Sequence, residues 1–285
     1  MFAHETVWGW ALSLPAVALV VVFSLAPMAY AVYTSFFRHD MLTPPVFVGA
    51  ANYRALLTDA RFINSLKVTA VYVAGTVMPV WLASFGLALL VYRSGRMAGL
   101  WRTILFLPTV LPLVSVALVW KLFFHFNGPL NALLADAGFE PIPWLSSAKY
   151  APWAMIIMSW WHATGYYMVI FLAGLLAIPG TLYEAVAIDG GGAWARLRHV
   201  TLPLMRPVFA LVLVLSIVNG IKTFVFQYVV TGGGPGTATQ VITLLIYQTA
   251  FSFLRMGSAA AISVVLFVAV LILSLIQLRL LRSEV

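Results

Sequence analysis

The sequence predicts an all-α membrane protein with six transmembrane helices, and two observations support this fold class. The first is composition: 63% of the residues are hydrophobic and 8% are charged, whereas soluble domains average about 45–50% apolar and about 25% charged residues. The second is the presence of long intervals without a charged residue, since a helix needs about 20 mainly apolar residues to cross a bilayer. We therefore expect residues 1–285 to form one membrane domain.

The six spans follow the charge-free intervals in chain order. Five intervals reach or approach the required length, but residues 207–221 form a short one, so the fifth span must include Lys222 and continue toward Tyr228. Prolines inside the spans predict local kinks, which are tolerated where neighbouring groups satisfy the freed backbone. The expected spans are 8–36, 65–91, 100–124, 151–178, 204–228 and 257–281.

Two apolar segments could suggest a different topology, one as a seventh span and the other as a cleaved signal peptide. Residues 231–240 contain four glycines, a proline and three threonines, so we expect a loop followed by a short helix within 240–254, at the outer surface or re-entering the membrane. Residues 29–31 resemble a signal-peptide cleavage site. However, no lysine or arginine precedes Trp8 and the apolar run is too long, so we expect an uncleaved span.

The polar segment 179–203 predicts two short helices between the fourth and fifth spans. Thr181 and Glu184 have the spacing of a capping box, which predicts a helix start at Leu182. The glycines at 190–192 end that helix, because glycine adopts the left-handed turn that closes a helix. A second helix is expected over 193–199, before Pro203 prevents its continuation.

This spacing resembles the EAA loop of the permease subunits of bacterial ABC importers. The family pattern is Glu-Ala-Ala, three residues, Gly, nine residues, Ile, one residue and Leu-Pro. Val186 replaces the third Ala and Val200 replaces Ile. An Asp before the Gly resembles the carbohydrate branch, although Gly191 departs from its usual Ala and predicts a looser helix end. The residues in register are Glu184, Ala185, Gly190, Leu202 and Pro203, and Asp189 is the acidic residue before the Gly. The resemblance implies that they couple the chain to its ATPases.

Segments 226–235 and 246–251 are similar to those of sugar and glycerol-phosphate permeases, and the whole resemblance runs from about Pro15 to the end. It implies a permease for a sugar or glycerol-phosphate-type solute in a bacterial plasma membrane. The implied partners are a second homologous permease, two ATP-binding-cassette subunits and an extracytoplasmic solute-binding protein. No cofactor is expected on this chain, and ATP and Mg²⁺ are expected on the ATPases. The solute, and which permease contacts it, stay open.

The outer half of the fifth span is the predicted substrate path. Polar side chains within a span are costly in lipid, which favours a functional role for them. Asn219, Lys222 and Phe226 have the i, i+3, i+7 spacing of one helix face, and Gln227 follows. Lys222 could instead snorkel to the membrane surface. Trp160 and Tyr166 are candidates for stacking on a sugar, with core packing as the competing interpretation.

The distribution of basic residues indicates the orientation of the chain in the membrane and the kind of anionic group that it contacts. With the N-terminus inside, eight lysines and arginines lie on each side, but the inner ones sit closer to span ends, which favours cytoplasmic termini. The stronger reason is that an EAA-like loop must face cytoplasmic ATPases. Since the basic residues are scattered at span boundaries, the net charge of +8 indicates anionic lipid headgroups rather than nucleic acid.

Three other function classes fit less well: an ATPase, a membrane phosphotransferase and an ion-coupled carrier. The chain has no phosphate-binding G-x-x-x-x-G-K-[ST] loop, so it cannot hydrolyse ATP itself. Asp189 and the glycines after it begin like the motif of CDP-alcohol phosphotransferases, but Trp194 replaces the arginine and the further metal-binding aspartates are missing. The histidines are isolated, so no metal site is expected. An ion-coupled secondary transporter would need intramembrane relays, for which only His162 qualifies.

Overall fold

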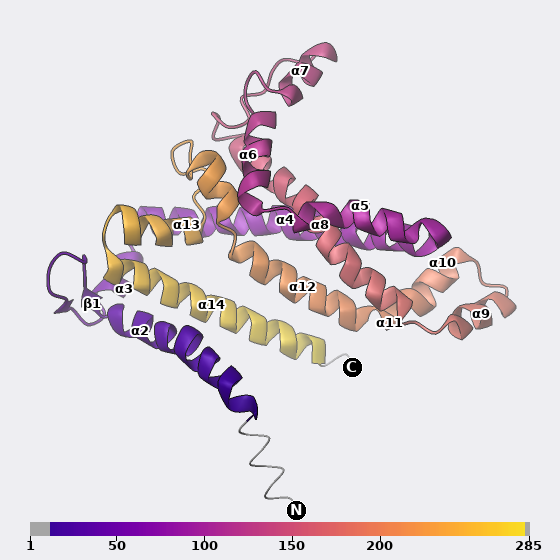
Figure 1. The fold of residues 1–285 in the computed structure, drawn as a ribbon, viewed down its shortest axis with the longest axis horizontal. Coiled ribbons are helices and arrows are strands. Elements are labelled where there is room, and N and C mark those ends of the chain that lie inside the picture. Colours follow the sequence, from indigo (N-terminus) through magenta and orange to yellow (C-terminus); the bar gives the residue numbers. More distant parts are fainter. Residues whose placement is uncertain (1–11, 283–285) are drawn as a thin grey trace, which may run out of the picture. The chain divides into compact units, whose positions relative to one another are not determined.

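The computed structural model describes residues 12–282, so the start of the first expected span, residues 8–11, lies outside the described residues. In this part of the chain the secondary-structure elements are helices apart from one antiparallel pair of short strands, β1 (Phe37–Arg38) and β2 (Val46–Phe47), with Phe37 opposite Phe47 (Figure 1). The shorter helices are η1 (Val21–Leu25), α2 (Ala26–Thr34), α3 (Ala51–Leu56), η2 (Gly95–Met97) and α7 (Pro129–Asp136).

Within residues 12–282, four helices are long and apolar enough to cross a membrane by themselves. They are Leu12–Thr34, α4 (Ala60–Arg93), α8 (Ala151–Leu176) and α14 (Met256–Arg282). Two bent pairs also meet this criterion: Gly95–Val110 with Leu113–Phe123, and Ala193–Leu204 with Arg206–Ile221. Counting each pair as one span gives the six that the sequence predicts.

The third span is not the continuous helix expected over 100–124. It consists of α5 (Ala98–Val110) and α6 (Leu113–Phe123), which meet at 92°. The bend follows from Pro112, because a residue that precedes proline avoids the helical region. Leu111 is accordingly extended, with φ −69° and ψ 142°.

The fifth span also differs from its expected extent of 204–228. Helix α12 (Arg206–Ile221) ends one residue before Lys222. The chain is non-helical at Thr223 and Phe224 and becomes helical again in η4 (Gln227–Thr231). The Thr223 carbonyl accepts a hydrogen bond from the Thr243 hydroxyl, so a side chain replaces the missing helical donor. The expected single helix face through residue 226 is therefore wrong.

The glycine-rich segment after η4 forms the predicted loop. Gly232, Gly233 and Gly236 have φ between 60° and 95°, a region that glycine adopts without the steric cost of a side chain. Helix α13 (Ile242–Tyr247) and η5 (Gln248–Ser252) then form one apolar helix that is shorter than a span. A loop followed by a short helix is thus confirmed, and its position relative to the membrane stays a prediction.

The chain divides into two compact units, of which one combines the segment up to Ile63 with Leu245–Ala269. In this unit the Asn52 side-chain amide donates hydrogen bonds to the carbonyls of Ser35 and Phe37, at 2.8 and 3.0 Å. Gly257 lies so close to the Phe37 carbonyl that a Cβ would be 1.8 Å from that oxygen. These contacts fix the chain between α2 and α3 against the start of α14.

The other unit combines Asn64–Leu244 with the segment from Val270, and it packs around α8. Small residues allow close helix approach in membrane proteins, and a Cβ at Gly165 would lie 1.9 Å from the Leu105 carbonyl oxygen of α5. Gly75 of α4 similarly faces Ile156 of α8. This unit contains the loop and the cavity described next.

Candidate functional site

The predicted coupling loop begins with α9 (Gly180–Ile188), two residues earlier than expected. Pro179 is the residue before the helix, and its carbonyl accepts the Leu182 amide at 3.2 Å. No side chain caps this end. The capping-box interpretation of Thr181 and Glu184 is therefore wrong, because the Pro179 carbonyl closes the first turn and places both residues inside the helix.

The C-terminal end of α9 is closed by glycine, as predicted. Gly190 has φ +78° and its amide donates to the Ala187 carbonyl at 3.1 Å, while the Gly191 amide donates to the Val186 carbonyl at 2.8 Å. This pair of bonds is a Schellman motif. The looser end expected from Gly191 is wrong, since a Cβ there would lie 2.5 Å from the Val186 side chain.

The second helix of the loop is longer than the expected 193–199. It runs through α10 (Ala193–Arg196), the π-helical η3 (Leu197–Thr201) and α11 (Leu202–Leu204). Pro203 lies within it and does not end it. The wider π turn accommodates a residue that has no amide donor, and the Thr201 hydroxyl donates to the Arg196 carbonyl at 3.3 Å. The bend of 63° comes at Met205 instead.

The outward surface of this loop is partly apolar. Tyr183 and Val186 pack toward the core around α8, while Glu184, Ala185, Asp189 and Gly190 are exposed and Leu202 and Pro203 are half-buried. Figure 1 shows α9 beyond the end of α8. The exposed apolar side chains are Leu182, Ile188 (86% exposed) and Trp194 (67% exposed).

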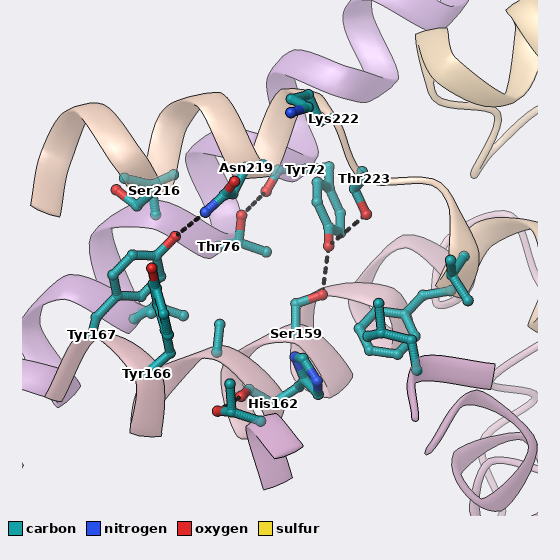
Figure 2. Close-up of a pocket in the computed structure, with 18 of the residues that line it drawn as sticks. Tyr72, Thr76, Ser159, His162, Tyr166, Tyr167, Ser216, Asn219, Lys222 and Thr223 are labelled. Atoms are coloured by element: carbon teal, nitrogen blue, oxygen red, sulfur yellow. Dashed lines mark hydrogen bonds between the residues drawn. The ribbon is translucent and has the colours of Figure 1, made fainter. Parts of the chain in front are cut away.

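A cavity of about 420 Å³ lies between α4, α8 and α12, with the bend between α5 and α6 at its edge (Figure 2). Its volume is in the range of about 300–1,000 Å³ that is usual for ligand pockets. Apolar residues supply much of the wall, and no acidic side chain is among the lining residues. The polar lining residues are Tyr72, Thr76, Thr109, Ser159, His162, Tyr166, Tyr167, Ser216, Asn219, Lys222 and Thr223.

Hydrogen bonds organise two sides of this cavity. On one side the Asn219 amide donates to the Tyr167 hydroxyl at 3.2 Å. On the other, the Tyr72 hydroxyl lies 2.5 Å from the Ser159 hydroxyl and accepts from Thr223 at 3.2 Å. Figure 2 shows both groups facing the same space. They link α12 and the chain after it to α4 and α8.

The structure brings together most of the predicted substrate-path residues. Asn219, Lys222, Phe226 and Tyr166 line the cavity, although residues 219 and 226 belong to different helices. Gln227 does not line it. Trp160 also lies outside, and its indole nitrogen donates to the Gly75 carbonyl at 2.8 Å, so this residue joins α8 to α4.

Sequence reasoning missed the contribution of α4 and most of that of α8. Tyr72, Thr76 and Val80 are four residues apart on α4, and Ser159, His162 and Tyr166 are three or four apart on α8. This spacing places each set on one helix face. The signal was present as polar residues at helical spacing within two apolar spans, but the sequence did not show that the two faces meet.

His162 is the only lining histidine of this cavity. Its Nε2 atom is buried without a hydrogen-bond partner, and its ring lies edge-on to Phe226 with the centroids 5.7 Å apart. Within residues 12–282, no group of three or more His, Cys, Asp or Glu side chains is placed to hold a metal ion. The cavity therefore offers hydroxyls, amides, an imidazole and one ammonium for recognition.

The comparisons with known proteins agree with this architecture. The family described as "Binding-protein-dependent transport system inner membrane component" matches residues 54–283. The trehalose/maltose transport system permease protein of Thermococcus litoralis is 33% identical over 281 residues, which cover 97% of this chain and 94% of that protein. The sn-glycerol-3-phosphate transport system permease protein of Agrobacterium fabrum is 34% identical, with coverages of 95% and 93%.

Among solved structures, the chain is similar in fold to a chain of the bacterial alginate ABC transporter in complex with alginate pentasaccharide-bound periplasmic protein. The TM-score is 0.85 at 22% identity, covering 96% of this chain and 93% of that chain. Permeases of this family are not catalytic, and separate subunits hydrolyse ATP, which agrees with the missing phosphate-binding loop. The carrier and transferase alternatives are thereby set aside. The chain belongs to the family of binding-protein-dependent transport system inner membrane components, as the permease subunit of an ABC importer.

Proposed function

We propose that this permease moves a sugar or a glycerol-phosphate-type solute through the cavity between α4, α8 and α12. The observation that carries this proposal is the set of hydroxyl and amide side chains around a space of about 420 Å³ inside apolar helices. Hydroxyl groups of a sugar match such donors and acceptors. The two permease relatives are named for solutes of these two classes, trehalose and maltose for one and sn-glycerol 3-phosphate for the other.

The aromatic and apolar lining suits the same kind of solute. Tyr166 and Tyr167 lie edge-on to each other with centroids 5.1 Å apart, and both face the cavity. Sugar rings present C–H faces that pack on such surfaces, while their hydroxyls need hydrogen-bond partners. A buried polar group without a partner costs about 1–3 kcal/mol, so His162 Nε2 gains from a solute hydroxyl.

The loop around α9 is the proposed ATPase-docking element. Its Schellman motif gives a helix with a fixed end, and Ile188 and Trp194 are apolar side chains that this chain leaves uncovered. Coupling by rigid displacement requires a stiff element with two discrete positions. ATP and Mg²⁺ would be held by the partner subunits, and closure of those subunits would move α9 together with α8 and α12.

The full complex would contain this chain, a second homologous permease, two ATPase subunits and an extracytoplasmic solute-binding protein. The loop 179–204 then faces the cytoplasm, as do both termini, and Lys222 lies toward the outer side. The alginate transporter supplies a precedent of the same fold with a periplasmic binding protein. The substrate path would run between the two permeases.

Purification of the native complex tests this function. We expect the other permease and the ATPases to co-purify, and mass spectrometry of the associated binding protein to identify a sugar or glycerol phosphate. Reconstituted complex should then take up that solute only with ATP inside the cytoplasmic compartment. Uptake that runs on a proton gradient without ATPase subunits, or a binding protein loaded with an amino acid, would contradict the proposal.

A further inference from the structure

A second cavity, of about 250 Å³, lies next to the first and shares Tyr72 with it. Four parts of the chain form its wall: the start of α4, the start of α8 with the residues just before it, the start of η4 and the end of the glycine-rich loop. Its lining is mainly apolar. Its lining residues include Lys67, Ala148, Pro152, Met155, Gln227 and Ala238.

The two cavities follow each other along the helices. On α8 the second cavity contacts Pro152 and Met155, and the first begins at Ser159 and extends to Tyr167. The loop with α9 follows the end of α8 at Leu176. Along this helix the order is therefore second cavity, first cavity and coupling loop, with about 1.5 Å per residue between successive positions.

A hydrogen-bonded partition separates the two spaces. The Tyr72 hydroxyl is held by Ser159 at 2.5 Å and by Thr223 at 3.2 Å. The Thr223 hydroxyl also lies 3.1 Å from the Gln227 side-chain oxygen, so its single hydrogen is shared between Tyr72 and Gln227. Tyr72 and Ser159 come from α4 and α8, Thr223 from the break after α12 and Gln227 from η4. Ser159 and Thr223 line the first cavity, Gln227 lines the second and Tyr72 lines both.

Gln227 has an unsatisfied polar group at this partition. The residue is 1% exposed and lines the second cavity, yet its amide nitrogen has no hydrogen-bond partner. Exchanging the amide oxygen and nitrogen would only move the unsatisfied position to the oxygen. An unsatisfied buried polar group costs about 1–3 kcal/mol, so this side chain is suited to a ligand that supplies the missing partner.

We propose that the second cavity is a binding subsite for one hydroxylated unit of the transported solute, a sugar ring or a glycerol unit. The Gln227 amide hydrogen-bonds a solute hydroxyl, Lys67 at the rim donates to a second oxygen, and the apolar wall packs on the C–H face. This subsite rests on the proposed function. With the coupling loop in the cytoplasm, it is the outer of two successive sites, and Tyr72 lies between them.

Thiol labelling tests this subsite, because the chain contains no cysteine. Ala238→Cys places one thiol in the wall of the second cavity, and Ser146→Cys places a control thiol at an exposed position that does not line it. N-ethylmaleimide labelling of this chain is followed in reconstituted complex with maltose, lactose or sn-glycerol 3-phosphate, each added directly. At ten times its Kd a solute leaves roughly one site in eleven open, so labelling at 238 should slow about tenfold and labelling at 146 should not change.

Two substitutions assign the protection to the second cavity. Asn219→Ala changes the first cavity and should leave the protection of the thiol at 238 in place. Gln227→Met removes the amide, keeps a side chain of similar volume and should abolish that protection. Ala148→Trp, at an exposed rim position, should block the subsite without a buried substitution, and Ser146→Trp is its matched control.

The outcomes separate this subsite from the proposed function. Protection that survives Gln227→Met and Ala148→Trp, or that is lost in Asn219→Ala, would show that the solute occupies only the first cavity. Absence of protection by the solute that the complex takes up would show that this solute does not occupy the second cavity. Uptake without protection overturns the subsite alone, and protection without ATP-dependent uptake overturns the proposed function alone.

Discussion

The loop around α9 and the cavity beside α12 lie toward opposite ends of α12. The loop exposes apolar side chains to solvent, whereas the cavity buries polar groups that lack hydrogen-bond partners. In the loop, apolar side chains such as Ile188 and Trp194 are exposed. In the cavity, a polar atom such as Nε2 of the half-buried His162 is buried within apolar helices without a hydrogen-bond partner. The loop therefore needs a protein surface to cover it, and the cavity needs a polar solute or water. This difference matches the two proposed roles, ATPase docking at the loop and solute binding at the cavity.

The two regions also differ in how their geometry is fixed. The end of α9 depends on neighbours within six residues, through the Gly190 and Gly191 amides. The cavity depends on contacts between residues that are far apart in sequence, such as Tyr72 with Ser159 and Thr223. Substitutions in the loop should therefore change coupling with little effect on the solute, and substitutions in the cavity should change solute dependence with little effect on ATPase docking.

Gly190→Val should have the largest effect. Gly190 has φ +78°, a conformation that costs an ordinary side chain roughly 1–2 kcal/mol and a β-branched one more. We expect normal membrane insertion and nearly complete loss of ATP-driven uptake, because the ATPase-docking helix loses its defined end. Uptake, insertion and ATPase co-purification are measured together.

Gly192→Val is the matched control for that substitution. Gly192 has φ −78°, and a Cβ there would meet no atom within 4 Å. Uptake should stay near the wild-type rate. Normal uptake with full ATPase co-purification in Gly190→Val would remove the coupling role from α9, and equal damage in both variants would show that any bulk in this loop is harmful.

Asn219→Ala should have the next largest effect, on the solute side. Loss of one hydrogen bond of about 1–1.5 kcal/mol raises the half-saturating solute concentration roughly fivefold to tenfold. The readout is solute-stimulated ATP hydrolysis by reconstituted complex. Basal hydrolysis and assembly should not change, because the residue lies far along α12 from the loop.

Tyr167→Phe distinguishes solute contact from simple packing. Asn219 donates to the Tyr167 hydroxyl at 3.2 Å. If the only role of Asn219 were to position Tyr167, removing that hydroxyl would have the same effect as Asn219→Ala. We expect Tyr167→Phe to be milder than Asn219→Ala. Unchanged stimulation in Asn219→Ala would move the solute contacts to the partner permease.

Much of the loop could be predicted because its determinants are local, whereas the helix start was missed because the Pro179 carbonyl, rather than Thr181, closes the first turn. The prolines also show that local sequence does not always predict helix geometry. Pro79 lies within the continuous helix α4, while Pro112 comes at a 92° bend. Both occur in apolar sequence, so the sequence alone does not show which of the two prolines marks a bend.

The cavity could be predicted only in part, for a related reason. The cost of polar groups in lipid pointed to Asn219 and Lys222, and both line the cavity. That cost depends on the span alone, and the role of these residues in solute binding stays a prediction. The rotational register of α4 against α8 depends on close contacts such as Gly75 with Ile156, which no single-helix pattern reveals. Sequence reasoning therefore did not identify Tyr72 and Ser159 as cavity residues. It proposed Trp160 as a sugar-stacking residue, whereas the Trp160 indole donates to the Gly75 carbonyl and joins α8 to α4.

Lys222→Met should have a smaller, solute-dependent effect. Lys222 is exposed at the end of α12 and lines the cavity, and an exposed charge pair contributes about 1 kcal/mol or less. We expect stimulation by sn-glycerol 3-phosphate to need up to about fivefold more solute. Stimulation by maltose should not change.

Lys222→Arg keeps the positive charge and serves as the control, with little change expected for either solute. Equal losses for the phosphate and the neutral sugar in Lys222→Met would contradict a charge contact and would favour a snorkelling lysine that anchors the helix end. In that case the fold, rather than the solute, would explain the presence of a lysine at this position.

Thr181→Ala should have the smallest effect, and it sharpens the contrast between the two ends of α9. Removing a threonine that caps a helix costs about 0.5–2 kcal/mol, but no side chain caps this helix, and Thr181 lies inside its first turn. Alanine also has a higher helix propensity than threonine. We therefore expect the thermal unfolding midpoint of the complex and the uptake rate to match the wild type, or to rise slightly. A loss of stability comparable to that of Gly190→Val would mean that Thr181 does close the N-terminal turn in the assembled transporter, and the two ends of α9 would then be equally important for coupling.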